Sequence, residues 1–188
     1  AGVLNGLRFA YTQTILWAID QPSGPVRAND YSPEIYYELP VSRSVTAALG
    51  YKHLSNGGGL TDSADMNRIF ARASWHIALG NDWEATISPQ AWVYVGEDGG
   101  ADDLDRYWGY TSLMLSVGQL DGLKVSGMLR GNPGTGKGAG ELFISYPLTR
   151  LGGLGIYAFG QGFTGYGETI GDYRRRSSYA RFGIAFTR

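Results

Sequence analysis

The chain has 188 residues, a formal net charge of −1 and no cysteine. Its length suits one domain, which we expect to cover residues 1–188. The charge gives no basic field for nucleic acid, and the missing cysteines exclude disulfide scaffolds, thiol catalysis and cysteine metal sites. The 29 glycines and 13 tyrosines, without long runs of helix formers, are typical of many strands joined by tight turns.

Alternation of apolar and polar residues predicts about ten strands along the chain. They cover residues 5–18, 31–41, 43–55, 66–79, 82–95, 104–117, 120–130, 138–146, 152–162 and 174–187. The connections alternate between short turns and long loops, and the long ones cover 19–30, 56–65, 96–103, 131–137 and 163–173. Short turns at one end and long loops at the other are typical of bacterial outer-membrane barrels.

One face of each predicted strand is apolar. In the fourth strand that face holds Ile69, Ala71, Ala73, Trp75, Ile77 and Leu79. A soluble sandwich also has one apolar face, but a face about 40 Å long, with aromatic residues near the strand ends, favours a membrane. We therefore expect an all-β fold, an antiparallel transmembrane β-barrel.

On its lipid-facing side the first strand carries one polar residue, Gln13, among side chains such as Tyr11 and Ile15. An amide that faces hydrocarbon loses its water hydrogen bonds, at a cost of a few kcal/mol, so it needs a partner. A symmetric dimer would place each Gln13 near the other. The alternative is that a bulge turns Gln13 inward.

The third and fourth strands carry the residues that point to chemistry. His53 and Ser55 continue the apolar face of the third strand, and Asn67 opens the same face of the next strand. Side chains at i and i+2 of a strand point the same way, about 7 Å apart, so the three polar groups are expected to meet at the outer rim.

A histidine base activates a serine hydroxyl at neutral pH, and a third group must hold the imidazole in one tautomer. We therefore predict a catalytic set of Ser55 as nucleophile, His53 as base and Asn67 as orienting group. The plainer interpretation is that His53 and Ser55 are rim residues at the start of a loop.

At these residues the chain resembles the outer membrane phospholipase A family. The family signature His-x-Ser-Asn-Gly stands as residues 53–57, and its Asn-Arg pair stands as Asn67-Arg68. Further similarity lies at Tyr11-Thr12-Gln13, at Gly138–Pro147 and at Gly165–Glu168. The resemblance implies the same three catalytic roles, and a barrel of twelve strands, two more than the alternation predicts.

The resemblance also implies calcium and a dimer. The implied ligands are Ser63 and the carbonyl of Gly58 in one subunit and Ser23 of the partner, with Gln13 at the dimer interface. Oxygen ligands suit calcium, which would polarise the ester carbonyl. The chain departs from the family at Gly58, where an arginine is usual, and at Asp65, which adds a carboxylate near the metal.

The expected function is a calcium-dependent phospholipase, active as a homodimer at the outer leaflet of a Gram-negative outer membrane. Its partners would be phospholipid and membrane lipid, and Arg174–Arg176 could meet lipopolysaccharide phosphates, although a charged strand end is the simpler interpretation. Two alternatives remain open: a lipid A deacylase, and a porin-like or structural barrel without chemistry.

Overall fold

The computed structural model describes residues 3–59, 62–96, 99–119, 121–151 and 154–186. They form ten strands, as the alternation predicts: β1 (Leu7–Trp17), β2 (Val26–Pro40), β3 (Val45–Ser55), β4 (Asp65–Gly80), β5 (Trp83–Tyr94), β6 (Thr111–Gln119), β7 (Lys124–Asn132), β8 (Lys137–Leu151), β9 (Leu154–Tyr166) and β10 (Arg176–Ala185). A short 3-10 helix, η1 (Val3–Gly6), precedes β1, and a single-turn helix, α1 (Asp105–Trp108), lies between β5 and β6.

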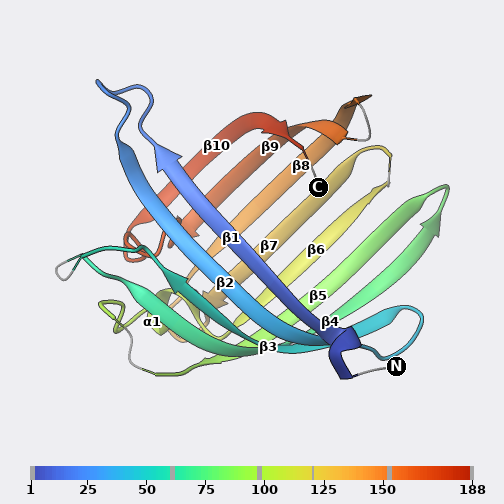
Figure 1. The fold of residues 1–188 in the computed structure, drawn as a ribbon, viewed down its shortest axis with the longest axis horizontal. Helices are drawn as coiled ribbons and strands as arrows, with labels where there is room; N and C mark the ends of the chain where they lie inside the picture. The colour runs from blue at the N-terminus through green and yellow to red at the C-terminus, as the bar shows by residue number, and fades with distance from the viewer. Residues whose placement is uncertain (1–2, 60–61, 97–98, 120, 152–153, 187–188) are drawn as a thin grey trace.

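The strands pair in chain order, each antiparallel to the next, in one sheet that runs from β1 to β10. The sheet curls strongly about its own axis, so that most of a barrel wall is formed (Figure 1). Among the described residues no register joins β1 to β10. The connections after β1, β3, β5, β7 and β9 are gathered at one end of the sheet, which we call the long-loop end.

Two predicted strands start at the wrong place: β2 starts at Val26, within the loop expected over 19–30, and the sixth predicted strand begins too early. Residues 104–110 were expected to be extended, but they contain α1, and β6 starts only at Thr111. Leu104 and Trp108 are both buried. Side chains four residues apart lie close together on one side of a helix, whereas in a strand they are too far apart to pack in the same place. Of the other predicted strands, residues 120, 152, 153 and 187 lie outside the described residues.

The two faces of the sheet differ in polarity in the sense that was predicted. Large apolar side chains are exposed on the outer face, among them Leu49, Ile69, Trp75, Val93 and Leu129. The inner face is polar: Lys52 forms an ion pair with Glu34 at 3.3 Å, and Arg68 stacks over Trp92 at 4.4 Å from the ring centroid. An apolar exterior around a polar interior is the arrangement of an outer-membrane barrel. No helix in the described ranges is long and apolar enough to cross a membrane.

A compact apolar core lies inside the long-loop end. It consists of Leu54, Ala64, Met66, Ala101, Leu104, Trp108, Ile170 and Tyr173, which come from β3, β4 and the three long loops after β3, β5 and β9. A further contact joins the loops after β5 and β9, since Asp103 accepts hydrogen bonds from the Tyr173 hydroxyl at 2.6 Å and from the Arg174 guanidinium at 2.9 Å. The same two groups hold the pKa of Asp103 below its ordinary value. The loops therefore pack on the ends of the strands that carry the predicted catalytic residues.

Candidate active site

The hairpin of β3 and β4 brings His53 and Asn67 together. The two residues are direct partners in the antiparallel register, on the outer face of the sheet. Nδ1 of His53 lies 2.8 Å from Oδ1 of Asn67, and both side chains are half-buried. The pairing that the sequence suggested is thus present in the structure.

The orientation of the Asn67 amide decides which nitrogen of the neutral imidazole carries the hydrogen. With Oδ1 of Asn67 facing the ring, that hydrogen is on Nδ1 of His53, because a carbonyl oxygen can only accept. In the neutral ring Nε2 is then bare and can accept a proton. This is the tautomer that a general base needs.

Ser55 lies two residues beyond His53 on the same face of β3. Its register partners are Tyr31 on β2 and Asp65 on β4. No hydrogen bond between the Ser55 hydroxyl and His53 is present in the described part of the chain, and such contacts are often long in a free enzyme and tighten when substrate binds. The structure therefore places all three predicted catalytic residues on one face and joins two of them directly.

Tyr51 is a member of this site that sequence reasoning missed. Alternation along β3 places Tyr51 with the apolar side chains of the outer face, and its hydroxyl donates to Oδ1 of Asn67 at 2.5 Å. Tyr51, His53 and Ser55 occupy every second position of β3 and therefore share one face, so the spacing that relates His53 to Ser55 also applies to Tyr51. The phenolic hydroxyl was the available signal.

The core beneath the strands holds these side chains in place. Leu54, between His53 and Ser55, points inward and is 8% exposed, and Met66, which precedes Asn67, is 0% exposed. Because successive side chains of a strand point to opposite faces, burying Leu54 and Met66 forces the residues beside them outward. The inner core thus orients the outer site.

The loop after β3 carries two of the predicted calcium ligands, and Asn56 closes it. Oδ1 of Asn56 accepts from the backbone N–H groups of Gly58 and Ala64, each at 3.0 Å, and its Nδ2 donates to the Asp62 carbonyl at 2.7 Å. A Cβ on Gly58 would lie 2.5 Å from the Asp62 oxygen and 3.0 Å from the Ser63 nitrogen. The backbone at Gly58 therefore lies against the backbone at Ser63.

Oxygen donors of this kind fit calcium, since a main-chain carbonyl and a hydroxyl are hard ligands. The described residues contain no group of three or more histidine, cysteine or carboxylate side chains that could hold a metal. The prediction that the Gly58 carbonyl and the Ser63 hydroxyl are calcium ligands does not depend on such a group. Both residues are exposed.

Asp65, which departs from the family pattern, is tied to another loop. Its Oδ1 accepts from the Gly99 N–H at 3.2 Å, and its own N–H donates to the Gly99 carbonyl at 2.9 Å. A Cβ on Gly99 would lie 2.3 Å from Oδ2 of Asp65, so only glycine fits there without a shift. The carboxylate therefore helps to fasten the loop after β5 beside Ser55.

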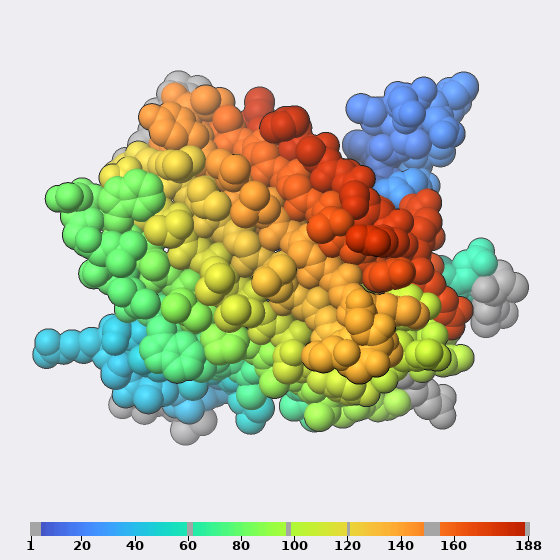
Figure 2. All heavy atoms as spheres, turned by 180° about the vertical axis from the view of Figure 1, so that it is seen from behind, coloured from blue at the N-terminus to red at the C-terminus, as the bar shows by residue number. Residues whose placement is uncertain are grey.

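Ser23, the third predicted ligand, lies in the turn between β1 and β2. It is exposed and has a positive φ of 66°, and the backbone hydrogen bonds from Gln21 and Gly24 stay within the turn. The end of the β1–β2 hairpin, in blue, stands clear of the other loops (Figure 2). The structure does not bring Ser23 to Gly58 and Ser63 of the same chain, and the prediction assigned it to a partner's site.

Gln13, the predicted dimer contact, faces outward as expected and has partners inside the chain. Its Nε2 donates to Oδ1 of Asn29 on β2 at 2.9 Å, and its Oε1 accepts from the Tyr11 hydroxyl at 3.2 Å. Asn29 in turn donates to the Tyr31 hydroxyl at 2.6 Å. A second subunit is therefore not the only source of hydrogen bonds for this amide.

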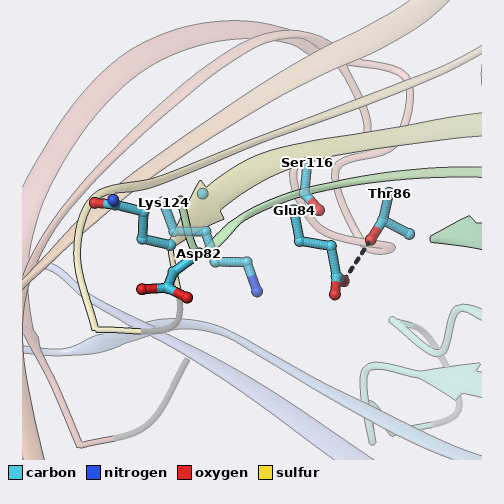
Figure 3. Close-up of a pocket in the computed structure, with 7 residues that line it drawn as sticks. Asp82, Glu84, Thr86, Ser116 and Lys124 are labelled. Carbon is cyan, nitrogen blue, oxygen red and sulfur yellow. Dashed lines mark hydrogen bonds between the residues drawn. The ribbon is translucent and has the colours of Figure 1, made fainter. Parts of the chain in front are cut away.

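A different pocket, of about 280 Å³, lies at the short-turn end, lined by Asp82, Glu84, Thr86, Ser116, Gly118, Gln119 and Lys124 (Figure 3). Thr86 and Glu84 both contact Nδ1 of the nearby His76, at 3.4 and 3.3 Å. A proton relay needs the hydroxyl and the carboxylate on different ring nitrogens, so this group does not form a second catalytic triad.

Nearly the whole chain is similar to known proteins. A family model described as phospholipase A1 matches residues 2–186. Phospholipase A1 of Klebsiella pneumoniae is 30% identical over 183 residues, which cover 93% of this chain and 60% of the relative. The chain spans 48% and 60% of the length of the first two curated relatives that it matches.

Two solved structures share the fold. Outer membrane phospholipase A from Escherichia coli is 27% identical, with a TM-score of 0.80, and the match covers 95% of this chain and 68% of that one. The outer membrane phospholipase dimer of Salmonella typhi, solved with bound calcium, is 25% identical, also with a TM-score of 0.80, over 95% of this chain and 69% of that one.

Proposed function

The chain belongs to the phospholipase A1 family, and on that premise we propose that it is a calcium-dependent phospholipase that hydrolyses acyl ester bonds. The observation that carries the proposal is the 2.8 Å contact of His53 with Asn67, with Ser55 two residues on, on the apolar outer face. A lipid ester can reach that face from the membrane without leaving its hydrocarbon surroundings.

In the proposed reaction Ser55 is the nucleophile. Nε2 of His53 takes the proton of the Ser55 hydroxyl as its oxygen attacks the ester carbonyl, and then returns that proton to the leaving alcohol. Water hydrolyses the acyl-enzyme by the same exchange of protons. Asn67 accepts the Nδ1–H of His53 throughout and keeps the ring in its productive orientation, without adding a charge.

Calcium would be held by the Gly58 carbonyl and the Ser63 hydroxyl, together with Ser23 of a second copy. When bound, such an ion polarises the ester carbonyl and stabilises the negative oxygen that forms on attack. The bound calcium and dimeric state of the Salmonella typhi structure support this assignment, as does the backbone contact between Gly58 and Ser63.

Dimerisation is proposed as the switch of this activity, because one chain alone lacks the Ser23 ligand beside Gly58 and Ser63. The proposed location is a bacterial outer membrane, which the apolar outer face and the similarity to the Escherichia coli outer membrane phospholipase support. Long loops of such barrels lie on the outside, so the site would act on phospholipids of the outer leaflet.

The test is phospholipid hydrolysis in detergent by the parent protein and by Ser55→Ala, each with calcium and with a calcium chelator. The parent should be active only with calcium, and Ser55→Ala should lose about 10³-fold or more, because the nucleophile is absent. Thermal unfolding of both proteins, measured by circular dichroism, is the control for an intact fold. A Ser55→Ala protein that hydrolyses phospholipid at the parent rate would remove the assignment.

A further inference from the structure

The hydrogen bond from Tyr51 to Asn67 affects which end of the Asn67 amide, its oxygen or its NH₂ group, faces His53. An aspartate offers oxygen on both sides, but an asparagine amide can present either its oxygen or its NH₂ group to a neighbour. If Nδ2 faced the imidazole, it would donate to Nδ1 of His53. The ring hydrogen would then sit on Nε2, and His53 could not accept the proton of Ser55.

Few contacts hold the Asn67 amide in its productive orientation. Within the described residues, Nδ2 of Asn67 has no hydrogen-bond partner, whereas Oδ1 has two, Tyr51 and His53. A carbonyl oxygen has two lone pairs, so it can accept from both at once. The His53 contact cannot choose between the orientations, because imidazole adapts its tautomer to either one.

The Tyr51 hydroxyl can make the choice. The oxygen of a phenol shares its lone pair with the ring, so the group donates hydrogen bonds more readily than it accepts them. At 2.5 Å from Oδ1, Tyr51 favours the orientation in which Asn67 presents oxygen. With its oxygen held in this position, Asn67 accepts a hydrogen bond from Nδ1 of His53 and thereby favours the tautomer with hydrogen on Nδ1.

We propose that Tyr51 is a positioning residue that selects the oxygen-facing orientation of Asn67 and thereby the base form of His53. The proposal rests on the proposed function of this site for its effect on rate, but its effect on the tautomer does not. The simpler role for an outward tyrosine at a barrel rim is membrane anchoring, which the phenol would perform without regard to Asn67.

The kinetic test is Tyr51→Phe in three backgrounds: the parent, Asn67→Asp and Asn67→Ala, assayed on a short-chain phosphatidylcholine in detergent micelles with calcium. In the parent, Tyr51→Phe should lower kcat about 5- to 10-fold, the worth of one hydrogen bond, with KM unchanged. It should cost less than about twofold with Asn67→Asp, since either carboxylate oxygen accepts, and with Asn67→Ala, since nothing is left to orient.

The matched control is Tyr146→Phe, which removes a phenolic hydroxyl from the exposed outer face of β8 and should leave kcat unchanged. Equal losses from Tyr51→Phe in all three backgrounds would overturn the proposal, because membrane anchoring does not depend on residue 67. No loss in the parent background would overturn it as well.

A spectroscopic test separates this inference from the enzymatic one. The chain has 2 histidines, so ¹⁵N NMR of a His76→Gln protein in micelles reports His53 alone. We expect hydrogen on Nδ1 in the parent and a mixture of tautomers in Tyr51→Phe. An unchanged tautomer would overturn the proposal even if the protein hydrolyses phospholipid, whereas the expected shift would uphold it in a protein without measurable activity.

Discussion

At the scale of single residues, the site depends on one oxygen atom. Oδ1 of Asn67 accepts from Tyr51 and from His53, and Ser55 lies on the same face. An orienting amide stabilises a developing imidazolium less than a carboxylate does, because it brings no charge. The residues of this site should therefore differ in how much each substitution costs.

Asn67→Ala is expected to lower phospholipid hydrolysis on the order of 10- to 100-fold, less than Ser55→Ala, because Ser55 and the base remain and only the orientation of His53 is lost. The measurement is kcat in detergent with saturating calcium. Gln90→Ala is the control, since Gln90 lies on the inner face of β5, whereas His53, Ser55 and the proposed dimer contacts lie on the outer face. A loss from Asn67→Ala no larger than that from Gln90→Ala would contradict the assigned role.

At the scale of elements, the hairpin of β3 and β4 and the loop between them act as one unit. Leu54 and Met66 anchor the strand ends from inside, and Asn56 closes the loop from its first residue. The two ligands predicted in this loop are thus held by strand register on one side and by one amide side chain on the other. Calcium binding should be sensitive to that amide.

Asn56→Ala is expected to raise the calcium concentration for half-maximal activity by roughly tenfold, because the hydrogen bonds at Gly58, Asp62 and Ala64 are lost and the loop must be ordered on binding. Calcium titration of activity and direct calcium binding by calorimetry both measure this change. Asn132, the last residue of β7, closes the loop after β7 with a comparable amide, and Asn132→Ala should leave the calcium requirement unchanged. A calcium requirement equal to the parent's in Asn56→Ala would show that the loop forms without it.

At the scale of the whole molecule, the outer face of β1 and β2 is the proposed place of subunit association. Tyr11, Gln13, Asn29 and Tyr31 form a hydrogen-bonded chain on that face. These hydrogen bonds already satisfy the Gln13 amide within one subunit. The free energy that a second subunit could add at Gln13 is therefore smaller than the full cost of an unpaired amide in hydrocarbon. Association should respond to Gln13 moderately rather than completely.

Gln13→Ala is expected to lower the association constant of the dimer in detergent roughly three- to tenfold, which is the contribution of about one hydrogen bond. Cross-linking and analytical ultracentrifugation with calcium and a substrate analogue measure it. Gln90→Ala, which changes a glutamine on the inner face of β5, is the control and should not alter association. An unchanged dimer fraction in Gln13→Ala would contradict the interface, and an active monomer would contradict the switch.

The sequence by itself determined the strand count, the polarity of the two faces and the common face of His53 and Ser55. These features follow from a period of two residues, which any strand expresses locally. The same local rule missed α1, because the burial of Leu104 and Trp108 depends on a core supplied by other loops.

Only the tertiary structure decided the contacts between strands. The register that pairs His53 with Asn67 spans a loop, and Asn29, which accepts from the Gln13 amide, lies on β2, so neither contact follows from spacing along one strand. The Tyr51 hydroxyl shows the difference most clearly: alternation places it on the outer face, but its role depends on an oxygen that the next strand brings within 2.5 Å. Hydrogen bonds act over a few ångströms, and folding alone sets which groups come that close.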